Sequence, residues 1–140
     1  MTLIVGAIIV DGLAASRRLL AARRTAPTWA AGRWEFVGGK VEPNEAPEAA
    51  LQREVMEELG VEVELGDELL GPRGGTWPIT SALRMRLWFC AITSGIPQLT
   101  SAHDDLRWLT PGQWHTVHWL DADDAVIDEL RRLPRFTETH

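Results

Sequence analysis

The segment "GGKVEPNEAPEAALQREVMEELGV", residues 38–61, constrains this chain most, because it combines the pattern of one helix with a crowd of glutamates. Apolar residues recur at helical spacing, and the glycine at position 60 is typical of the residue that follows a helix end. The pattern predicts a helix over residues 47–59 whose apolar side packs on a sheet. The apolar residues expected on that side are Ala49, Val55, Met56 and Leu59.

Three carboxylates share the other side of the predicted helix. At about 100° per residue, Glu54, Glu57 and Glu58 fall within an arc of roughly 100°. Like charges four residues apart destabilise a helix by about 0.2 to 0.5 kcal/mol, and the single guanidinium of Arg53 cannot neutralise three carboxylates. Hard divalent cations prefer such oxygen ligands, so the arc predicts a magnesium or manganese site. The alternative is an ordinary solvated acidic face, which spacing alone leaves equally open.

Length and charge narrow the remaining classes. The 140 residues favour one domain over residues 1–140, and the net charge of −6 argues against a nucleic acid polymer as partner. The apolar opening "TLIVGAIIVDG" is shorter than the roughly 20 residues of a membrane span, so no membrane partner is expected. The single cysteine, Cys90, lies in the apolar run "LWFCAI" and predicts a buried thiol and a cytoplasmic location. The oligomeric state stays open between monomer and homodimer.

Turn chemistry and alternation predict the other elements. The opening strand, closed by "DG", is expected to pair with "RRLLAARR" in a hairpin, and "WEFVGG" predicts a short strand that ends in a glycine turn. Strands are also predicted over "VEVELGDELLG", over the longest run "SALRMRLWFCAI", and over "LRWL" after a loop "TSGIPQLTSAHDD". A final helix over "DADDAVIDELRRL" precedes a frayed tail, "RFTETH". This order predicts an α/β (α+β) class with a mixed sheet between helices.

The acidic segment also resembles a known family. Gly39, Glu45 and the run "REVMEELGV" match every position of the Nudix hydrolase box, in which glycine and glutamate precede an Arg-Glu-apolar-x-Glu-Glu-x-Gly-apolar run. The segments "LLAARR", "GRWEF", "GGKVEP" and "LRWL", with the late "WLDADDAVIDEL", are similar to MutT-type nucleoside triphosphate pyrophosphohydrolases, especially the cytidine-preferring branch. The likeness covers nearly the whole chain. One departure is Val37, where many relatives carry proline.

The resemblance implies a Nudix fold, an α/β/α sandwich with a mixed sheet in which the box forms a loop, a helix and a second loop. It implies that the metal ligands are Glu54, Glu57, Glu58 and the Gly38 carbonyl, that Arg53 orients the carboxylates, and that Glu45 braces the loop.

Three further residues are candidates for binding substrate. Arg23 matches the family arginine after the second strand and is preferred to Arg24, which would alternate to the other face. Phe36 could pack against a base, although a buried aromatic in a strand is more often part of a core. Lys40 is the only lysine of the chain and follows the two glycines.

The implied reaction converts a nucleoside triphosphate and water into a monophosphate and pyrophosphate with Mg²⁺ or Mn²⁺. Glu54 is the first candidate for a metal-linked base, with Glu57 or a carboxylate outside the box as alternatives. Relatives often place that outside acid where this chain has Ala102, and Asp104 or Asp105 could replace it or be solvated loop residues. The intact box argues against a non-catalytic binding module, and the short chain argues against ADP-sugars and dinucleoside polyphosphates as substrates.

Asp123 stands where MutT-like relatives carry a base-reading side chain. An ionised aspartate only accepts hydrogen bonds, so it suits the exocyclic amine of cytosine or the amide and amino donors of guanine. Cytosine leads, and the residue predicts a preference for (d)CTP over uridine and thymidine triphosphates that Asp123→Asn abolishes. The alternative is an 8-oxo-dGTP-type sanitising hydrolase. Oxidised guanine needs a donor and an acceptor together, and an aspartate offers both only when it is protonated. Asp123 could also be a first-turn carboxylate favoured by the helix dipole.

Overall fold

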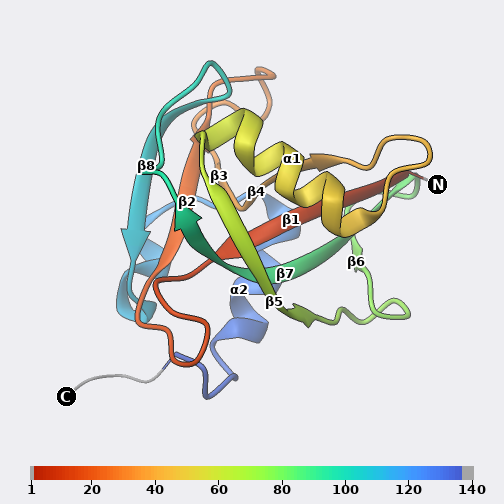
Figure 1. The fold of residues 1–140 in the computed structure, drawn as a ribbon. Coiled ribbons are helices and arrows are strands. Elements are labelled where there is room, and N and C mark those ends of the chain that lie inside the picture. The colour runs from red at the N-terminus through yellow and green to blue at the C-terminus, as the bar shows by residue number, and fades with distance from the viewer. Residues whose placement is uncertain (1, 137–140) are drawn as a thin grey trace.

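The computed structural model describes residues 2–136, which fold into two sheets flanked by helices (Figure 1). The elements follow in the order β1 (Thr2–Ile9), β2 (Leu19–Arg24), β3 (Trp34–Glu35), β4 (Val37–Lys40), α1 (Pro47–Leu59), β5 (Glu62–Leu69), β6 (Trp77–Pro78), β7 (Leu83–Ser94), β8 (His103–Leu109), the 3-10 helix η1 (Pro111–Thr116) and α2 (Asp121–Leu130). No helix within residues 2–136 is long and apolar enough to cross a membrane.

The larger sheet is mixed. Its strands run in the order β4, β1, β7, β5, with β6 also paired to β7. Strands β1 and β7 are parallel from the pair Thr2 and Leu83 to the pair Ile9 and Cys90, whereas β4, β5 and β6 pair antiparallel. The smaller sheet has the order β3, β2, β8. Helix α1 lies in front of the strands and α2 behind them (Figure 1), which confirms the predicted mixed sheet between helices.

Helix α1 is held by one apolar line, in which Leu51, Val55 and Leu59 are fully buried four residues apart. They pack with residues of β1, β4, β5 and β7 in one core cluster. The prediction was wrong for Ala49 and Met56, which are exposed, because each lies about 100° around the helix from a buried neighbour. The helix end was predicted correctly: Gly60 has a φ of 70° and donates its N–H to Met56 O.

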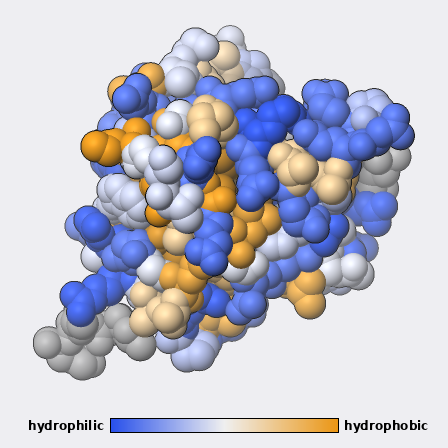
Figure 2. Space-filling model, in the orientation of Figure 1, coloured by the Kyte–Doolittle hydropathy of each residue, from blue (hydrophilic) through white to orange (hydrophobic). Residues whose placement is uncertain are grey.

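Helix α2 closes the second core cluster with Val126, Ile127 and Leu130. It ends at Leu130, three residues before the predicted end, although Leu133 still packs against the cluster. Viewed from the α1 side, apolar side chains gather in the middle of the molecular face and hydrophilic ones surround them (Figure 2).

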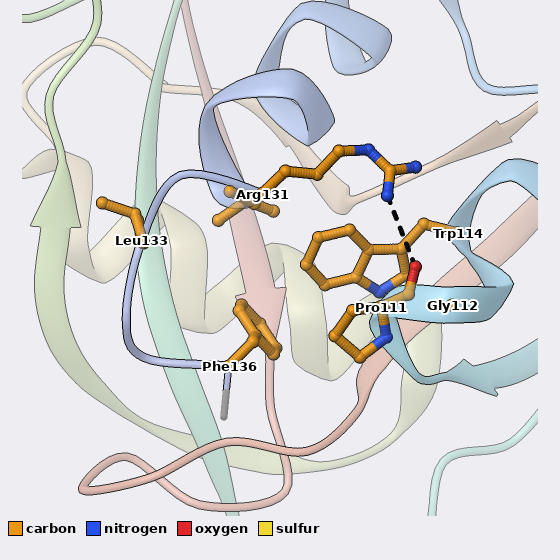
Figure 3. A pocket seen from close by; sticks show the side chains of 7 residues that line it. Pro111, Gly112, Trp114, Arg131, Leu133 and Phe136 are labelled. Atoms are coloured by element: carbon orange, nitrogen blue, oxygen red, sulfur yellow. Dashed lines mark hydrogen bonds between the residues drawn. The ribbon is translucent and has the colours of Figure 1, made fainter. Parts of the chain in front are cut away.

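The frayed tail is corrected for the residues that the structure describes. Phe136 is 8% exposed and its ring meets that of Trp114 edge-on at 4.9 Å (Figure 3). The carbonyl of Arg135 accepts the N–H of Ser16, so the chain is held to the loop after β1. Residues 137–140, the rest of that prediction, lie outside the described residues.

The predicted hairpin of the first two strands was also wrong. Strand β1 pairs with β4 and β7, and β2 pairs with β3 and β8 in the other sheet. Only one bridge, Val10 to Leu19, joins the two segments. Asp11 Oδ1 accepts the backbone N–H groups of Arg17 and Arg18, so the turn forms while the strands diverge.

Two segments near the site that were predicted as a turn and a loop belong to strands. Gly38 and Gly39 pair with Gly6 and Val5 as part of β4 rather than forming a turn. Strand β8 begins at His103, so Asp104 and Asp105 lie on a strand rather than in a loop. Cys90 is fully buried as predicted, and burial raises the pKa of its thiol to about 12.

Candidate active site

Arg53 ties the acidic segment together. Its Nε and Nη2 donate to the two oxygens of Glu45 at 2.9 and 3.0 Å, and Nη2 also donates to the carbonyl of Lys40 at 3.1 Å. Its Nη1 donates to Glu54 at 2.9 Å and to Glu57 at 3.4 Å. One guanidinium therefore links α1 to the loop before it and to the end of β4, and the planar donor fork fixes both carboxylates of the arc that it touches.

Glu45 belongs to the same arrangement. Its hydrogen bonds from Arg53, and then the N–H of Glu42, lower the pKa of Glu45 to about 2. The carboxylate is therefore ionised across the ordinary pH range, and it closes the loop between β4 and α1 from both sides. The bracing role that the resemblance implies for Glu45 stays a prediction, which these contacts support.

The two glycines of β4 leave no room for a side chain, each because of a different neighbour. A Cβ on Gly39 would lie 2.4 to 2.6 Å from the carboxyl atoms of Glu54, so this carboxyl rests directly on the glycine. A Cβ on Gly38 would lie 1.9 Å from the backbone oxygen of Val5, inside the sheet. The first contact involves the far end of a flexible side chain, and the second involves backbone that cannot move freely.

We therefore expect Gly39→Ala and Gly38→Ala to fail differently. Gly39→Ala should displace Glu54 and lower kcat at least about tenfold with little change in Tm, because loss of roughly 1.4 kcal/mol of transition-state stabilisation is one factor of ten. Gly38→Ala should lower Tm strongly, because β1 and β4 must separate. Thermal unfolding and kcat, measured on both variants, check this pair; an inactive Gly38→Ala with wild-type Tm would contradict the assignment.

Glu58 faces the interior of the site. Burial raises its pKa to about 8, with the charges of Glu35 and Glu54 as the next causes, while Arg24 and the N–H of Gly38 act in the opposite direction. Its Oε2 is buried without a hydrogen-bond partner. Glu57, by contrast, has a side chain that is 58% exposed. Like charges and an unpaired buried oxygen are the surroundings that a divalent cation would stabilise, so the donor set on this face of α1 fits a magnesium or manganese ion.

A buried network that the sequence reasoning missed adjoins Glu58. Arg24 Nη1 donates to both oxygens of Glu35 at 3.0 and 3.1 Å, and Nε2 of His103 is hydrogen bonded to Glu35 Oε2 at 2.8 Å. Glu35 is 8% and His103 2% exposed. The signal was present in "WEF", because strand alternation points Glu35 away from the core side of Trp34 and Phe36.

Arg23 does not join this network. Its Nε donates to Asp104 at 2.6 Å, and its guanidinium lies over the ring of Trp34. Asp105 accepts from the N–H of Leu106 and from Arg107. Arg23 thus pairs with Asp104, and Asp105 pairs within β8. The residues that reach Glu35 are Arg24 and His103 instead.

The other candidates for substrate binding are divided. The Phe36 side chain is 4% exposed and stacks on Trp119 with ring centres 5.1 Å apart, so it is part of the core. Lys40 is exposed at the end of β4. Asp123 is 5% exposed, and burial raises its pKa well above the usual range, with Glu35 as the second cause, while the N–H of Phe36 and the charge of Arg24 oppose the shift. Burial and the charge of Glu35 thus both favour the neutral form of the Asp123 carboxyl.

The first turn of α2 separates two kinds of acid. Asp121 is exposed and accepts a hydrogen bond from Arg33 Nη2 at 2.9 Å, whereas Asp123 is buried. A carboxylate placed only to complement the helix dipole has no reason to be buried, because the dipole stabilises exposed charge as well. Burial beside Glu35 separates Asp123 from its neighbours and keeps it a candidate for base contact.

Comparison with known proteins agrees with this site. The chain is 37% identical over 126 residues to a Mycobacterium tuberculosis protein provisionally named 8-oxo-dGTP diphosphatase 2, covering 89% of this chain and 87% of the relative. A shorter match, 52% identity over 50 residues, joins it to the CTP pyrophosphohydrolase of Escherichia coli and covers 36% and 37% of the two chains.

The fold is shared with solved structures as well. The solution structure of the E. coli ORF135 protein superposes with a TM-score of 0.74 at 29% identity, covering 100% of this chain and 95% of that one. The family model described as the NUDIX domain matches residues 2–135, which include the whole acidic segment and both helices. With the box residues gathered around Arg53, this match makes the chain a member of the Nudix hydrolase family.

Proposed function

We propose that the protein hydrolyses a nucleoside triphosphate to the monophosphate and pyrophosphate. The observation that carries this function is the fixed carboxylate arc of α1, in which Arg53 holds Glu54 and Glu57 while Glu58 keeps a buried oxygen unpaired. Magnesium or manganese bound to such carboxylates neutralises phosphate oxygens and activates an attacking water. The Gly38 carbonyl is the further ligand that we propose.

The residues of the chain then divide the work. Glu54 rests on Gly39 and is held by Arg53, so its position is fixed and it is the first candidate to accept a proton from the attacking water. Glu57 is exposed and can bind metal brought in with the triphosphate. In our proposal for substrate recognition, Arg24 replaces Arg23. Arg24 donates to Glu35, and its charge lowers the pKa of both Glu58 and Asp123.

Cytidine triphosphates are the first candidate substrates. The match to the CTP pyrophosphohydrolase of E. coli favours them, and so does an acidic side chain at position 123. A neutral carboxyl at Asp123 can donate to the ring nitrogen of cytosine, and the same group can accept from the exocyclic amine. Burial, and then the charge of Glu35, raises the pKa of Asp123, so our proposal uses its neutral carboxyl in place of an ionised one.

A second candidate is 8-oxo-dGTP. The M. tuberculosis relative supports it by its name, and the neutral form of Asp123 supports it chemically. Oxidised guanine, when rotated, presents a donor and a carbonyl acceptor together, and a protonated carboxyl matches both. The site thus supports two bases that an ionised aspartate would have separated.

A substrate panel tests the proposal. Rates with Mg²⁺ and with Mn²⁺ are compared as kcat/KM for dCTP, CTP, 5-methyl-dCTP, dTTP, UTP, dGTP and 8-oxo-dGTP, with ADP-ribose included for the alternative substrate class. A cytidine triphosphate or 8-oxo-dGTP is expected to rank first. Hydrolysis of ADP-ribose above all triphosphates would overturn the assignment to mononucleotides.

The products are a separate prediction. We expect each turnover to release one monophosphate and one pyrophosphate, because the resemblance of the box to MutT-type hydrolases implies that water attacks an inner phosphorus. Ion-exchange chromatography of the nucleotide products, together with assays of orthophosphate before and after adding inorganic pyrophosphatase, measures this. Nucleoside diphosphate and free orthophosphate in the absence of pyrophosphatase would contradict the expectation.

A further inference from the structure

Two buried polar atoms within residues 2–136 lack a hydrogen-bond partner, namely Glu58 Oε2 and His103 Nδ1. The residues that carry them form one cluster with Glu35, because one ligand atom from each of Glu35, Glu58 and His103 lies within 4.8 Å of the other two. Buried polar side-chain atoms are almost always paired in folded proteins, so the unpaired Glu58 Oε2 within this cluster indicates that a ligand belongs there.

The donor set identifies the ligand class. Two carboxylates and one imidazole are an oxygen and nitrogen set, and imidazole binds zinc, cobalt and similar cations in preference to magnesium. His103 is 2% exposed and its Nε2 is hydrogen bonded to Glu35, so its ring is held in place.

We propose that Glu35, Glu58 and His103 form a second cation site, which takes a borderline divalent ion of the zinc or cobalt type. The site shares Glu58 with the magnesium cluster of the proposed function and rests on that function only through this residue. Arg24 occupies two acceptor positions of Glu35 and His103 a third, so a carboxylate lone pair remains for the ion. The imidazole would exchange its hydrogen bond with Glu35 for a shared metal.

The test measures binding without nucleotide. Apo protein, the full chain, is titrated with Co²⁺ by visible absorption and with Zn²⁺ and Mg²⁺ by calorimetry, in wild type, His103→Gln and His115→Gln. His103→Gln keeps a side-chain donor near Glu35 and removes the imidazole, while His115 is an exposed histidine of η1 and serves as the matched control. We expect His103→Gln to weaken Zn²⁺ and Co²⁺ binding about tenfold or more and to leave Mg²⁺ binding within about twofold.

Either of two results would overturn the site: unchanged Zn²⁺ affinity in His103→Gln, or an equal loss in His115→Gln. If His103→Gln does not fold, ¹⁵N resonances of the imidazole rings in the wild type decide instead, and a His103 resonance that Zn²⁺ does not move refutes the proposal. Mg²⁺-dependent hydrolysis with no Zn²⁺ binding would remove this inference alone. Zn²⁺ binding without any triphosphate hydrolysis would remove the proposed function alone.

Discussion

Glu58→Gln is expected to lower kcat about 100-fold or more while leaving Tm unchanged or higher. Loss of one charged metal ligand removes several kcal/mol of charge stabilisation in the transition state, and each 1.4 kcal/mol is about tenfold in rate. Tm is not expected to fall with kcat, because burial and the charges of Glu35 and Glu54 all oppose the ionisation of Glu58 in the folded protein. Glutamine keeps the shape and removes that repulsion.

The measurements for this variant are kcat, Tm, and the increase in Tm caused by adding Mg²⁺. A ligand that binds only the folded state raises Tm, so Glu58→Gln should lose most of the Mg²⁺-induced rise that the wild type shows. Glu57→Gln should also lower kcat sharply with the fold preserved. Glu48→Gln is the control, since Glu48 is an exposed glutamate of the same helix with no contact to Arg53 in the structure. Near-normal turnover in well-folded Glu57→Gln and Glu58→Gln would refute the metal assignment.

The acidic helix could be predicted because its pattern is local. Helical spacing set its limits, the glycine at position 60 set its end, and the arc of Glu54, Glu57 and Glu58 follows from the spacing alone. The contact of Arg53 with Glu57 was also within reach, because it joins residues four apart. The contact of Arg53 with Glu45 could not be predicted from spacing, because it depends on the path of the loop between β4 and α1.

Partners that come from distant segments could not be predicted in the same way. Glu35 and His103 are 68 residues apart, and only the pairing of β2 with both β3 and β8 brings them together. Exchanging Arg23 for Arg24 depended on a register shift between these two residues in the pairing with β8, which a pattern of alternation does not show. The hairpin prediction failed for a related reason: turn residues predict that the chain reverses, not which sheet receives the next strand.

Asp123 is expected to contribute to stability in a way that depends on pH. Its folded pKa is raised by burial and by Glu35, so the folded state binds the proton more tightly than the unfolded chain does. Stability from this group is complete below the unfolded pKa of about 3.9 and is lost as pH rises toward the folded pKa. Asp123→Asn cannot ionise, so its Tm relative to wild type should increase as pH is raised from 4 to 8. A constant difference in Tm across that range would show that the carboxyl ionises alike in both states.

The same substitution decides how Asp123 contacts the base. Asparagine presents a donor and an acceptor as a protonated carboxyl does, so Asp123→Asn should keep kcat/KM for dCTP within a few-fold, whereas Asp123→Ala should lower it about tenfold or more. From the sequence alone, Asp123→Asn was predicted to lose the preference for (d)CTP, because an ionised aspartate was assumed. Burial beside Glu35 reverses that expectation, and Asp121→Asn, which changes an exposed acid of the same helix turn, is the control. Loss of most of the kcat/KM for dCTP in Asp123→Asn would indicate an ionised Asp123, and an unchanged kcat/KM in Asp123→Ala would remove Asp123 from base recognition and leave it a buried residue of the first turn of α2.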